Sequence, residues 1–166
     1  MTIVAVRGNV IAADRMATVS GTALTVPKLF TVRDGSLVHI VSGEKYPIVI
    51  AISGDYGLGL MRARWFADPD TDHTDYPKAI DNHWARIVVA TYDNVSAYED
   101  YPAAINYLDE YVAFGSGMDY AMGAMRNGAD AIEAVSVTCV FDTSCGNGVE
   151  FARLVPFPDS TILKAE

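Results

Sequence analysis

Two short apolar runs at the start of the chain predict a β-hairpin. Residues 2–7 and 10–14 are rich in valine, isoleucine and alanine, and Gly8-Asn9 separates them. Glycine as the first residue of a two-residue loop is typical of a type II′ turn. Side chains that would point to either face of this hairpin are apolar, so we expect a sheet that is covered on both faces.

The rest of the pattern predicts further short strands and helices. Runs with strand character fall at residues 28–32, 37–41, 47–53, 86–92, 95–98, 111–114 and 149–155. Helices are predicted over residues 54–67, 118–126 and 129–140. This order lacks the regular strand–helix alternation of a parallel sheet. It favours an α+β fold, a four-layer α-β-β-α sandwich of two stacked antiparallel sheets with helices outside.

The chain reads as one domain. We find no internal repeat, no low-complexity segment and no linker, and 166 residues are enough for one sizeable core. The expected organisation is therefore a single domain over residues 1–166. Residues 68–81 are acidic and contain proline, and we interpret them as a solvated surface loop.

Composition and charge exclude several functional classes. With 51% hydrophobic and 20% charged residues, the chain does not belong to the disordered class of low hydropathy. A net charge of −9 without a basic stripe argues against nucleic-acid binding. No apolar run reaches the roughly 18 residues of a membrane span. The first residues lack the basic and apolar regions of a signal peptide.

Cysteine and histidine usage indicates a reduced protein without a metal site. Cys139 and Cys145 have a C-x5-C spacing, which fits neither a zinc site nor a disulfide framework. The three histidines are scattered without metal-ligand spacing. We therefore expect a cytoplasmic location and no bound metal.

The second residue carries the first candidate chemistry. Thr2 follows Met1, and a small second residue permits removal of the methionine, which leaves a free α-amine beside the threonine hydroxyl. That hydroxyl is a poor nucleophile until a base takes its proton. The α-amine, with an ordinary pKa of about 7.7, can be that base. Many proteins also begin with Met-Thr for no catalytic reason.

Two charged residues gain meaning from the predicted hairpin. If Gly8 and Asn9 form its loop, the strands pair so that Asp14 lies beside Thr2. Lys28 interrupts an apolar run. If it points inward, Asp14 is its obvious partner, and its ammonium group would favour ionisation of the Thr2 hydroxyl. The alternatives are an Asp14 that caps the following turn and a Lys28 that faces solvent.

Two glycine-rich segments are ambiguous on local evidence. Gly115-Ser116-Gly117 could open a dinucleotide-binding fingerprint, but Tyr120 stands where a third glycine would be. It also fits a tight turn in which Ser116 caps the next helix. Residues 142–148 fit a plain glycine-rich turn. No Ser/His/Asp or Cys/His set can be assembled from the sequence.

Taken in order along the chain, these segments resemble the proteasome β-type subunits, which are N-terminal-nucleophile hydrolases. The nearest subtype is the bacterial HslV-type peptidase. The resemblance covers nearly the whole chain and rests on residues 2–8, 11–18, 28, 50–54, 113–117 and 142–146. It implies the α-β-β-α fold of that family and the activity of a threonine-type endopeptidase.

The resemblance also implies a role for each matching residue. Thr2 would be the nucleophile and its α-amine the general base. Asp14 would orient Lys28, and the backbone N–H of Gly54 would form the oxyanion hole. The pocket for the substrate residue before the cut would be lined by Ala17, Thr18, Val26, Phe30, Ile52 and Tyr56.

Near the α-amine the sequence both follows and departs from the family. Ser116 and Asp142 would hold the amine and a water molecule. Cys145 stands beside them where the family has serine, so that a weak S–H donor replaces a hydroxyl. Asp55 stands next to the oxyanion-hole glycine, where a small neutral residue is common. Between residues 67 and 86 the second long helix of the family is predicted to be shortened or lost, which bears on ring contacts and ATPase docking.

The sequence therefore predicts an N-terminal threonine peptidase that acts on unfolded polypeptides or peptides through a Thr2 acyl-enzyme. It would need no cofactor and would assemble as a homo-oligomeric ring, with an ATPase unfoldase as a further partner. Neither nucleic acid nor a membrane is an expected partner. Three alternatives stay open: a non-catalytic ring or assembly protein, favoured if Met1 is retained; a small-molecule amidase of the same fold; and a nucleotide-binding module.

Overall fold

The computed structural model describes residues 2–158, in which a run of strands, one helix, a second run of strands, two helices and a last strand follow one another. The strands are β1 (Ile3–Arg7), β2 (Val10–Asp14), β3 (Met16–Val19), β4 (Thr22–Thr25), β5 (Leu29–Arg33), β6 (Ser36–His39), β7 (Lys45–Tyr46), β8 (Ile48–Gly54), β9 (Ala85–Thr91), β10 (Val95–Tyr98), β11 (Ile105–Tyr107), β12 (Tyr111–Gly115) and β13 (Val149–Leu154). The helices are α1 (Tyr56–Ala67), α2 (Met118–Arg126) and α3 (Ala131–Phe141), with a short 3-10 helix at His73–Asp75.

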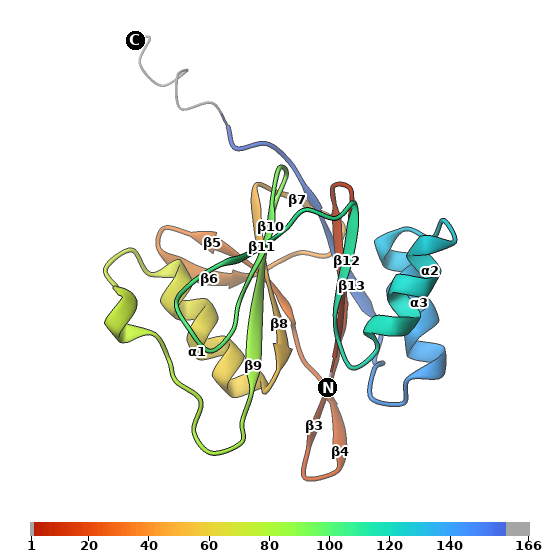
Figure 1. The fold of residues 1–166 in the computed structure, drawn as a ribbon, viewed down its shortest axis with the longest axis horizontal. Coiled ribbons are helices and arrows are strands. Elements are labelled where there is room, and N and C mark those ends of the chain that lie inside the picture. Colours follow the sequence, from red (N-terminus) through yellow and green to blue (C-terminus); the bar gives the residue numbers. More distant parts are fainter. Residues whose placement is uncertain (1, 159–166) are drawn as a thin grey trace.

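The strands form two stacked sheets with helices on both outer sides (Figure 1). The five-stranded sheet has the order β12-β1-β2-β13-β7, and the six-stranded sheet has the order β11-β10-β9-β8-β5-β6. Helices α2 and α3 cover the first sheet and α1 covers the second, while β3 and β4 project as a separate hairpin. The predicted four-layer α-β-β-α sandwich is therefore confirmed.

The opening hairpin has the predicted register. Arg7 pairs with Val10, and the pairing continues along β1 and β2. Gly8 has a φ of +56°, which suits the first position of the predicted type II′ turn. On its other side β1 pairs with β12, from Ile3 opposite Gly115 onward. This second pairing brings the glycine-rich turn after β12 next to the start of the chain.

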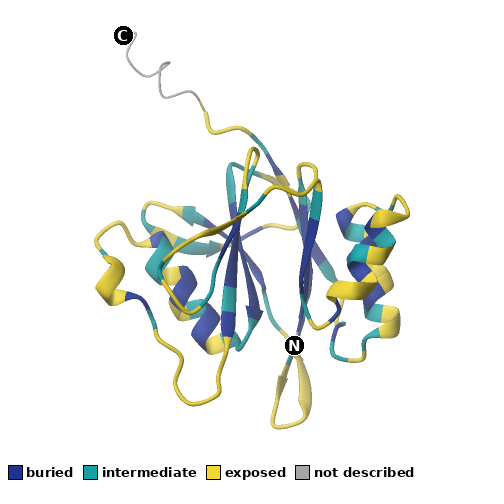
Figure 2. Cartoon of the chain, viewed as in Figure 1, coloured by how far each residue is buried: buried dark blue, intermediate teal, exposed yellow. Residues whose placement is uncertain are grey.

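Three apolar clusters fill the spaces between the layers (Figure 2). Alternate residues of β1 divide between two of them. Val4 and Val6 pack between the sheets, whereas Ile3 and Ala5 pack under α2 and α3. The third cluster lies between α1 and the six-stranded sheet. The hairpin is thus buried on both faces, as its sequence predicts.

The structure corrects two details of the sequence-based prediction. The five-stranded sheet is not purely antiparallel, because β7 pairs parallel to β13. Strands β3, β4, β7 and β11 were not predicted. They have two to four residues each and are largely exposed, so burial imposes little pattern on them. In α1, the apolar Met61 is 55% exposed, whereas the charged Arg62 is fully buried.

Arg62 explains how the segment after α1 is held. Its guanidinium group donates hydrogen bonds to the backbone C=O of Pro77 and of Ala85. Between α1 and β9 the structure holds only the short helix His73–Asp75, so the second long helix is absent there, as predicted. Among residues 2–158 no helix has the length and apolarity needed to cross a membrane.

Candidate active site

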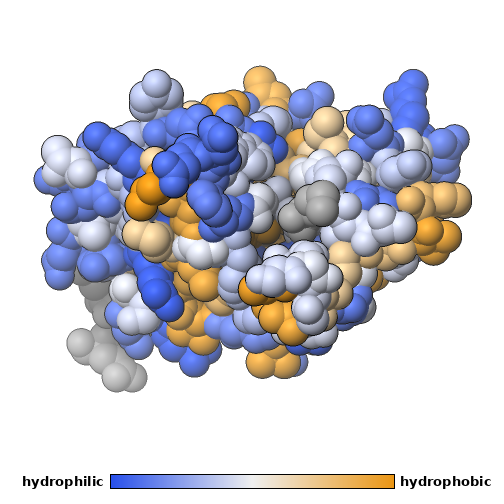
Figure 3. Space-filling view, turned by 90° about the horizontal axis from the view of Figure 1, so that it is seen from below, coloured by the Kyte–Doolittle hydropathy of each residue, from blue (hydrophilic) through white to orange (hydrophobic). Residues whose placement is uncertain are grey.

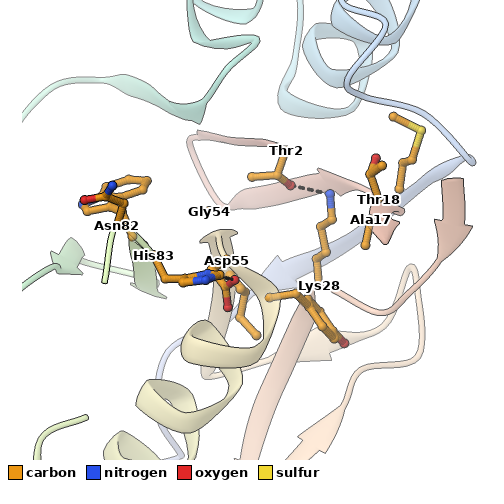
Figure 4. A pocket seen from close by; sticks show the side chains of 12 residues that line it. Thr2, Ala17, Thr18, Lys28, Gly54, Asp55, Asn82 and His83 are labelled. Atoms are coloured by element: carbon orange, nitrogen blue, oxygen red, sulfur yellow. Dashed lines mark hydrogen bonds and ion pairs between the residues drawn. The ribbon is translucent and has the colours of Figure 1, made fainter. Parts of the chain in front are cut away.

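The Thr2 hydroxyl lies in a buried cluster with a cation and an anion. It accepts a hydrogen bond from Lys28 Nζ at 2.5 Å and donates one to Asp14 Oδ1 at 2.8 Å. The same Asp14 oxygen lies 2.7 Å from Lys28 Nζ. Exposure is 2% for Thr2, 3% for Lys28 and 0% for Asp14. Figure 4 shows the Lys28 side chain directed at Thr2. The three residues come from three segments that the hairpin and the sheet stacking bring together.

Asp14 is held in place by the backbone around it. Its Oδ1 also accepts a hydrogen bond from the N–H of Ile3, and its Oδ2 accepts from the N–H groups of Met16 and Gly146. The bond from Met16 is the turn cap that was the alternative interpretation of this residue, so Asp14 both caps the turn and contacts Thr2 and Lys28. A carboxylate with this many donors stays in one position and can orient a lysine.

Burial has the largest effect on the pKa of Lys28. It lowers the pKa of the ammonium group from the ordinary 10.5, while the nearby Asp14 carboxylate opposes that shift. With 3% exposure, Lys28 faces inward, which excludes the solvent-facing alternative. Its position 2.5 Å from Thr2 Oγ1 allows its positive charge to favour ionisation of the hydroxyl.

Gly54 ends β8 beside this cluster, and its conformation requires glycine. Its φ is +96°, and a Cβ atom there would lie 2.4 Å from the backbone oxygen of Trp84. Asp55 follows as the N-cap of α1, where its Oδ1 accepts from the N–H of Leu58 and its Oδ2 pairs with His83 Nδ1, each at 2.8 Å. The Leu58 hydrogen bond chiefly lowers the pKa of Asp55. Both oxygens of the Asp55 carboxylate therefore have partners within the protein.

The turn after β12 lies against the backbone of Thr2. A Cβ atom on Gly115, whose φ is +115°, would lie 1.9 Å from the Thr2 carbonyl oxygen. Ser116 Oγ donates a hydrogen bond to Asp142 Oδ2 at 2.9 Å. The N-cap of α2 is Gly117, without a side-chain hydrogen bond, so the alternative in which Ser116 caps that helix is wrong.

Asp142 and Cys145 complete this side of the cluster. Burial raises the pKa of Asp142, but hydrogen bonds from Ser144 and Ser116 outweigh it, so the net shift is downward. Cys145 Sγ lies 3.4 Å from Asp142 Oδ2. Burial, reinforced by the charge of Asp14, raises the pKa of this thiol to about 12. Cys145 therefore remains a neutral thiol, which can donate only a weak hydrogen bond.

A cavity of about 410 Å³ opens beside Thr2 (Figure 4). Its lining is Thr2, Met16, Ala17, Thr18, Lys28, Ile52, Gly54, Asp55, Tyr56, Asn82, His83 and Trp84. Two residues predicted to line the substrate pocket do not. Phe30 packs in the apolar cluster under α1, and Val26 is half-buried outside the cavity lining. Residues 82–84 were missed because they lie in an irregular segment without a hydrophobic period.

A second cavity of about 410 Å³ lies on the other side of Thr2. It shares Thr2, Gly54 and Trp84 with the first and is otherwise lined by Ser53, Arg86, Gly115, Ser116 and Met118. Thr2 therefore lies between two openings. Among residues 2–158 no group of three or more His, Cys, Asp or Glu side chains is placed to hold a metal ion.

Comparisons with known proteins give matches at the level of structure only. No protein-family model matches the chain, and no curated protein sequence matches it. The structure is similar to that of BPH from Thiobacillus denitrificans, with a TM-score of 0.63 and 19% identity over 95% of this chain and 100% of that one. The same protein in complex with Epoxomicin matches with the same TM-score and identity, over 94% of this chain and 100% of that one. Eukaryotic HslV from Trypanosoma brucei matches with a TM-score of 0.57 and 16% identity, over 92% of this chain and 98% of that one. The chain therefore has the proteasome β-type fold of the N-terminal-nucleophile hydrolases.

Proposed function

We propose that the protein is an N-terminal threonine peptidase that hydrolyses peptide bonds through an acyl-enzyme on Thr2. The observation that carries this proposal is the buried contact of the Thr2 hydroxyl with Lys28 and Asp14. Removal of Met1 would place a free α-amine on the same residue. A hydroxyl, a cation and a base would then meet at one buried position, as nucleophilic catalysis requires.

In the first half-reaction, Thr2 Oγ1 attacks the carbonyl carbon of the substrate and the hydroxyl proton passes to the α-amine. Lys28 stabilises the developing negative charge on Oγ1 before the new C–O bond forms. The tetrahedral oxyanion lies against the N–H of Gly54. When the C–N bond breaks, the protonated α-amine gives its proton to the departing nitrogen, and an ester on Thr2 remains.

In the second half-reaction, water replaces the departed segment. The α-amine takes a proton from that water, whose oxygen attacks the ester carbonyl. When the ester C–O bond breaks, the protonated amine returns the proton to Thr2 Oγ1, and the free hydroxyl and amine are restored. Ser116 and Asp142, which are joined by a hydrogen bond, would hold the amine and the water. Cys145 contributes little to this hydrogen bonding because its thiol is neutral.

The two cavities give a polypeptide a path across Thr2. The residue before the cut would occupy the first cavity and the departing segment would leave through the second. BPH, which has this fold, has been observed in complex with Epoxomicin. Epoxomicin is therefore a suitable ligand to test for binding to this chain.

We expect cleavage after Leu, Tyr or Phe in preference to Lys, Arg or Asp. The lining of the first cavity includes the apolar side chains of Met16, Ala17 and Ile52, against which an apolar substrate side chain could pack. Both carboxylate oxygens of Asp55 already have partners, the N–H of Leu58 and Nδ1 of His83. A basic substrate side chain in this cavity would therefore lack a free carboxylate. A preference of about 10-fold, or about 1.4 kcal/mol, is expected.

Fluorogenic peptides that differ only in the residue before the cut measure this preference. Asp55→Asn is the matched variant, because asparagine can still cap α1 without a charge. It should leave the ranking of Leu, Tyr and Phe unchanged. Faster cleavage after Arg than after Leu by the wild type, lost in Asp55→Asn, would show that Asp55 faces the substrate instead.

We expect a homo-oligomeric ring, since this fold occurs in oligomeric assemblies. Apolar side chains gather over α2 and α3, at the right-hand end of Figure 3, and include Tyr120, Val140 and Phe141, which are 48–75% exposed. Such a patch commonly marks a contact surface. Light scattering at micromolar concentration should give a multiple of the monomer mass, and Val140→Asp should lower it. A wild type that is only monomeric would contradict this expectation.

Such a ring would enclose the active sites and admit unfolded polypeptide or peptides. An ATPase unfoldase could deliver the polypeptide, although the short segment between α1 and β9 offers a different surface from a long helix. Cys139 and Cys145 are free thiols, which fits a cytoplasmic location.

A further inference from the structure

We infer that Glu150 is a positioning residue whose buried carboxylate fixes the backbone from which Lys28 reaches Thr2. Glu150 lies on β13 in the five-stranded sheet, whereas Lys28 immediately precedes β5 in the six-stranded sheet. The inference rests on the proposed function, because Lys28 matters here through its contact with the nucleophile. Nothing in the sequence pattern distinguishes Glu150 from a charged strand residue that faces solvent.

Glu150 joins the two sheets through a single carboxylate oxygen. Its Oε1 accepts hydrogen bonds from the backbone N–H of Lys28 at 2.5 Å and of Leu29 at 2.8 Å. The carbonyl oxygen of Lys28 accepts a third bond, from the N–H of Ile52 at 3.1 Å. The Lys28 backbone is therefore held at both its N–H and its C=O. The Cα atom of Lys28 is thus fixed, and its side chain extends to the buried contacts of Nζ with Thr2 and Asp14.

The path of the chain explains why a side chain performs this task. Regular pairing of β5 with β6 ends where Phe30 lies opposite His39. After His39 the chain leaves β6, crosses to the five-stranded sheet and forms β7. The backbone N–H groups at the start of β5 therefore receive their acceptor from β13 and not from a neighbouring strand. Buried N–H groups need such an acceptor.

The carboxylate itself is held by groups from other elements. His39 Nε2, on β6, donates a hydrogen bond to Glu150 Oε2 at 2.9 Å. Arg15 Nε, after β2, lies 4.0 Å from the same oxygen and has no hydrogen-bond partner within residues 2–158. Glu150 is only 3% exposed, so its charge depends on these neighbours. Burial chiefly raises the pKa of Tyr56 on α1, and the charge of Glu150 adds to that rise.

Glu150 also acts on Lys28 through its charge. Burial lowers the pKa of Lys28, and Glu150 is one of the carboxylates that oppose this shift. Loss of the Glu150 charge should therefore lower the pKa of Lys28 further. The alkaline side of the pH–kcat profile would then move to lower pH, because Lys28 would lose its proton earlier. A residue that only stabilised the fold would not move this limb.

Two variants separate the hydrogen bonds of Glu150 from its charge. Glu150→Gln keeps an oxygen that can accept from both N–H groups, so kcat should stay within about 10-fold of wild type. Glu150→Ala removes the acceptor, and kcat should fall on the order of 100-fold, since a small misplacement of a catalytic group costs about that much. Both are compared below their melting temperatures, with circular dichroism confirming that they are folded.

The pKa of Lys28 is measured by NMR titration of protein labelled with 13C at the lysine ε-carbons. The chain has four lysines, so few signals need to be assigned. The Lys28 pKa should be lower in Glu150→Gln than in wild type, while the exposed Lys45 is unchanged. Glu110→Gln is the matched control, because Glu110 is 78% exposed and faces an arginine at 3.7 Å. This variant should change neither kcat nor the Lys28 pKa.

Folded Glu150→Ala with wild-type kcat would overturn the inference, as would an unshifted Lys28 pKa in Glu150→Gln. An inactive wild type would instead refute the proposed function. The Lys28 titration would still decide whether Glu150 acts on Lys28, so the two failures are distinguishable.

Discussion

Replacing Thr2 by alanine is expected to lower kcat by at least about 10³-fold, as loss of the nucleophile does in hydrolases that form an acyl-enzyme. Alanine lacks the oxygen that lies 2.5 Å from Lys28 Nζ and 2.8 Å from Asp14 Oδ1. The fold should persist, because Thr2 contributes no large apolar side chain to the core. Steady-state hydrolysis of a fluorogenic peptide measures the loss.

Thr2→Ser is the matched control, because serine keeps both the hydroxyl and the α-amine. It should retain measurable turnover. Alanine and serine are both small enough to permit removal of Met1, so the two variants differ only at the reacting oxygen. Full activity of Thr2→Ala would show that hydrolysis occurs elsewhere on the protein.

Lys28→Ala is expected to lower kcat on the order of 100-fold or more, a loss typical of removing one preorganised electrostatic group from an active site. The variant should still fold, because Asp14 keeps the hydrogen bonds from the N–H groups of Ile3, Met16 and Gly146. Breaking a buried ion pair nevertheless costs about 3 kcal/mol of unfolding free energy. Thermal or urea unfolding measures that cost separately from kcat.

The pH dependence of the wild type provides a second test of Lys28. Because burial lowers its pKa below the ordinary 10.5, the charge that supports Thr2 is present at lower pH and is lost as pH rises through the lowered value. The alkaline limb of kcat should therefore begin below pH 10.5. Lys28→Met, which has a similar volume without the charge, should lack that limb. Lys45→Ala, at an exposed position, is the control and should have the pH profile of the wild type. If folded Lys28→Met has the same turnover as the wild type, Lys28 is an ordinary buried lysine without a role in catalysis.

Much of the site follows from local rules of sequence. The Gly8-Asn9 turn fixes the register of β1 and β2, and that register alone places Asp14 next to Thr2. An interrupting charge in the apolar run around Lys28 needs a buried partner, and Asp14 supplies it. These inferences succeed because strand pairing and charge pairing are strong, short-range constraints.

Other parts of the site depend on contacts that no local pattern encodes. Asn82, His83 and Trp84 line the first cavity only because Arg62 and the path after α1 hold that segment there. Glu150 reaches Lys28 from the opposite sheet, across 122 positions of sequence. Sequence periodicity carries no information on such pairs, because it reports only which face of an element is buried.

The mass of the intact, active protein tests the central claim most directly. The proposed mechanism uses the α-amine of Thr2 as the base, so the active species must begin at Thr2. Mass spectrometry of protein that hydrolyses peptides should therefore give the mass of the chain without Met1. Full activity in protein that still carries Met1 would contradict the account, because Thr2 would then have no free amine.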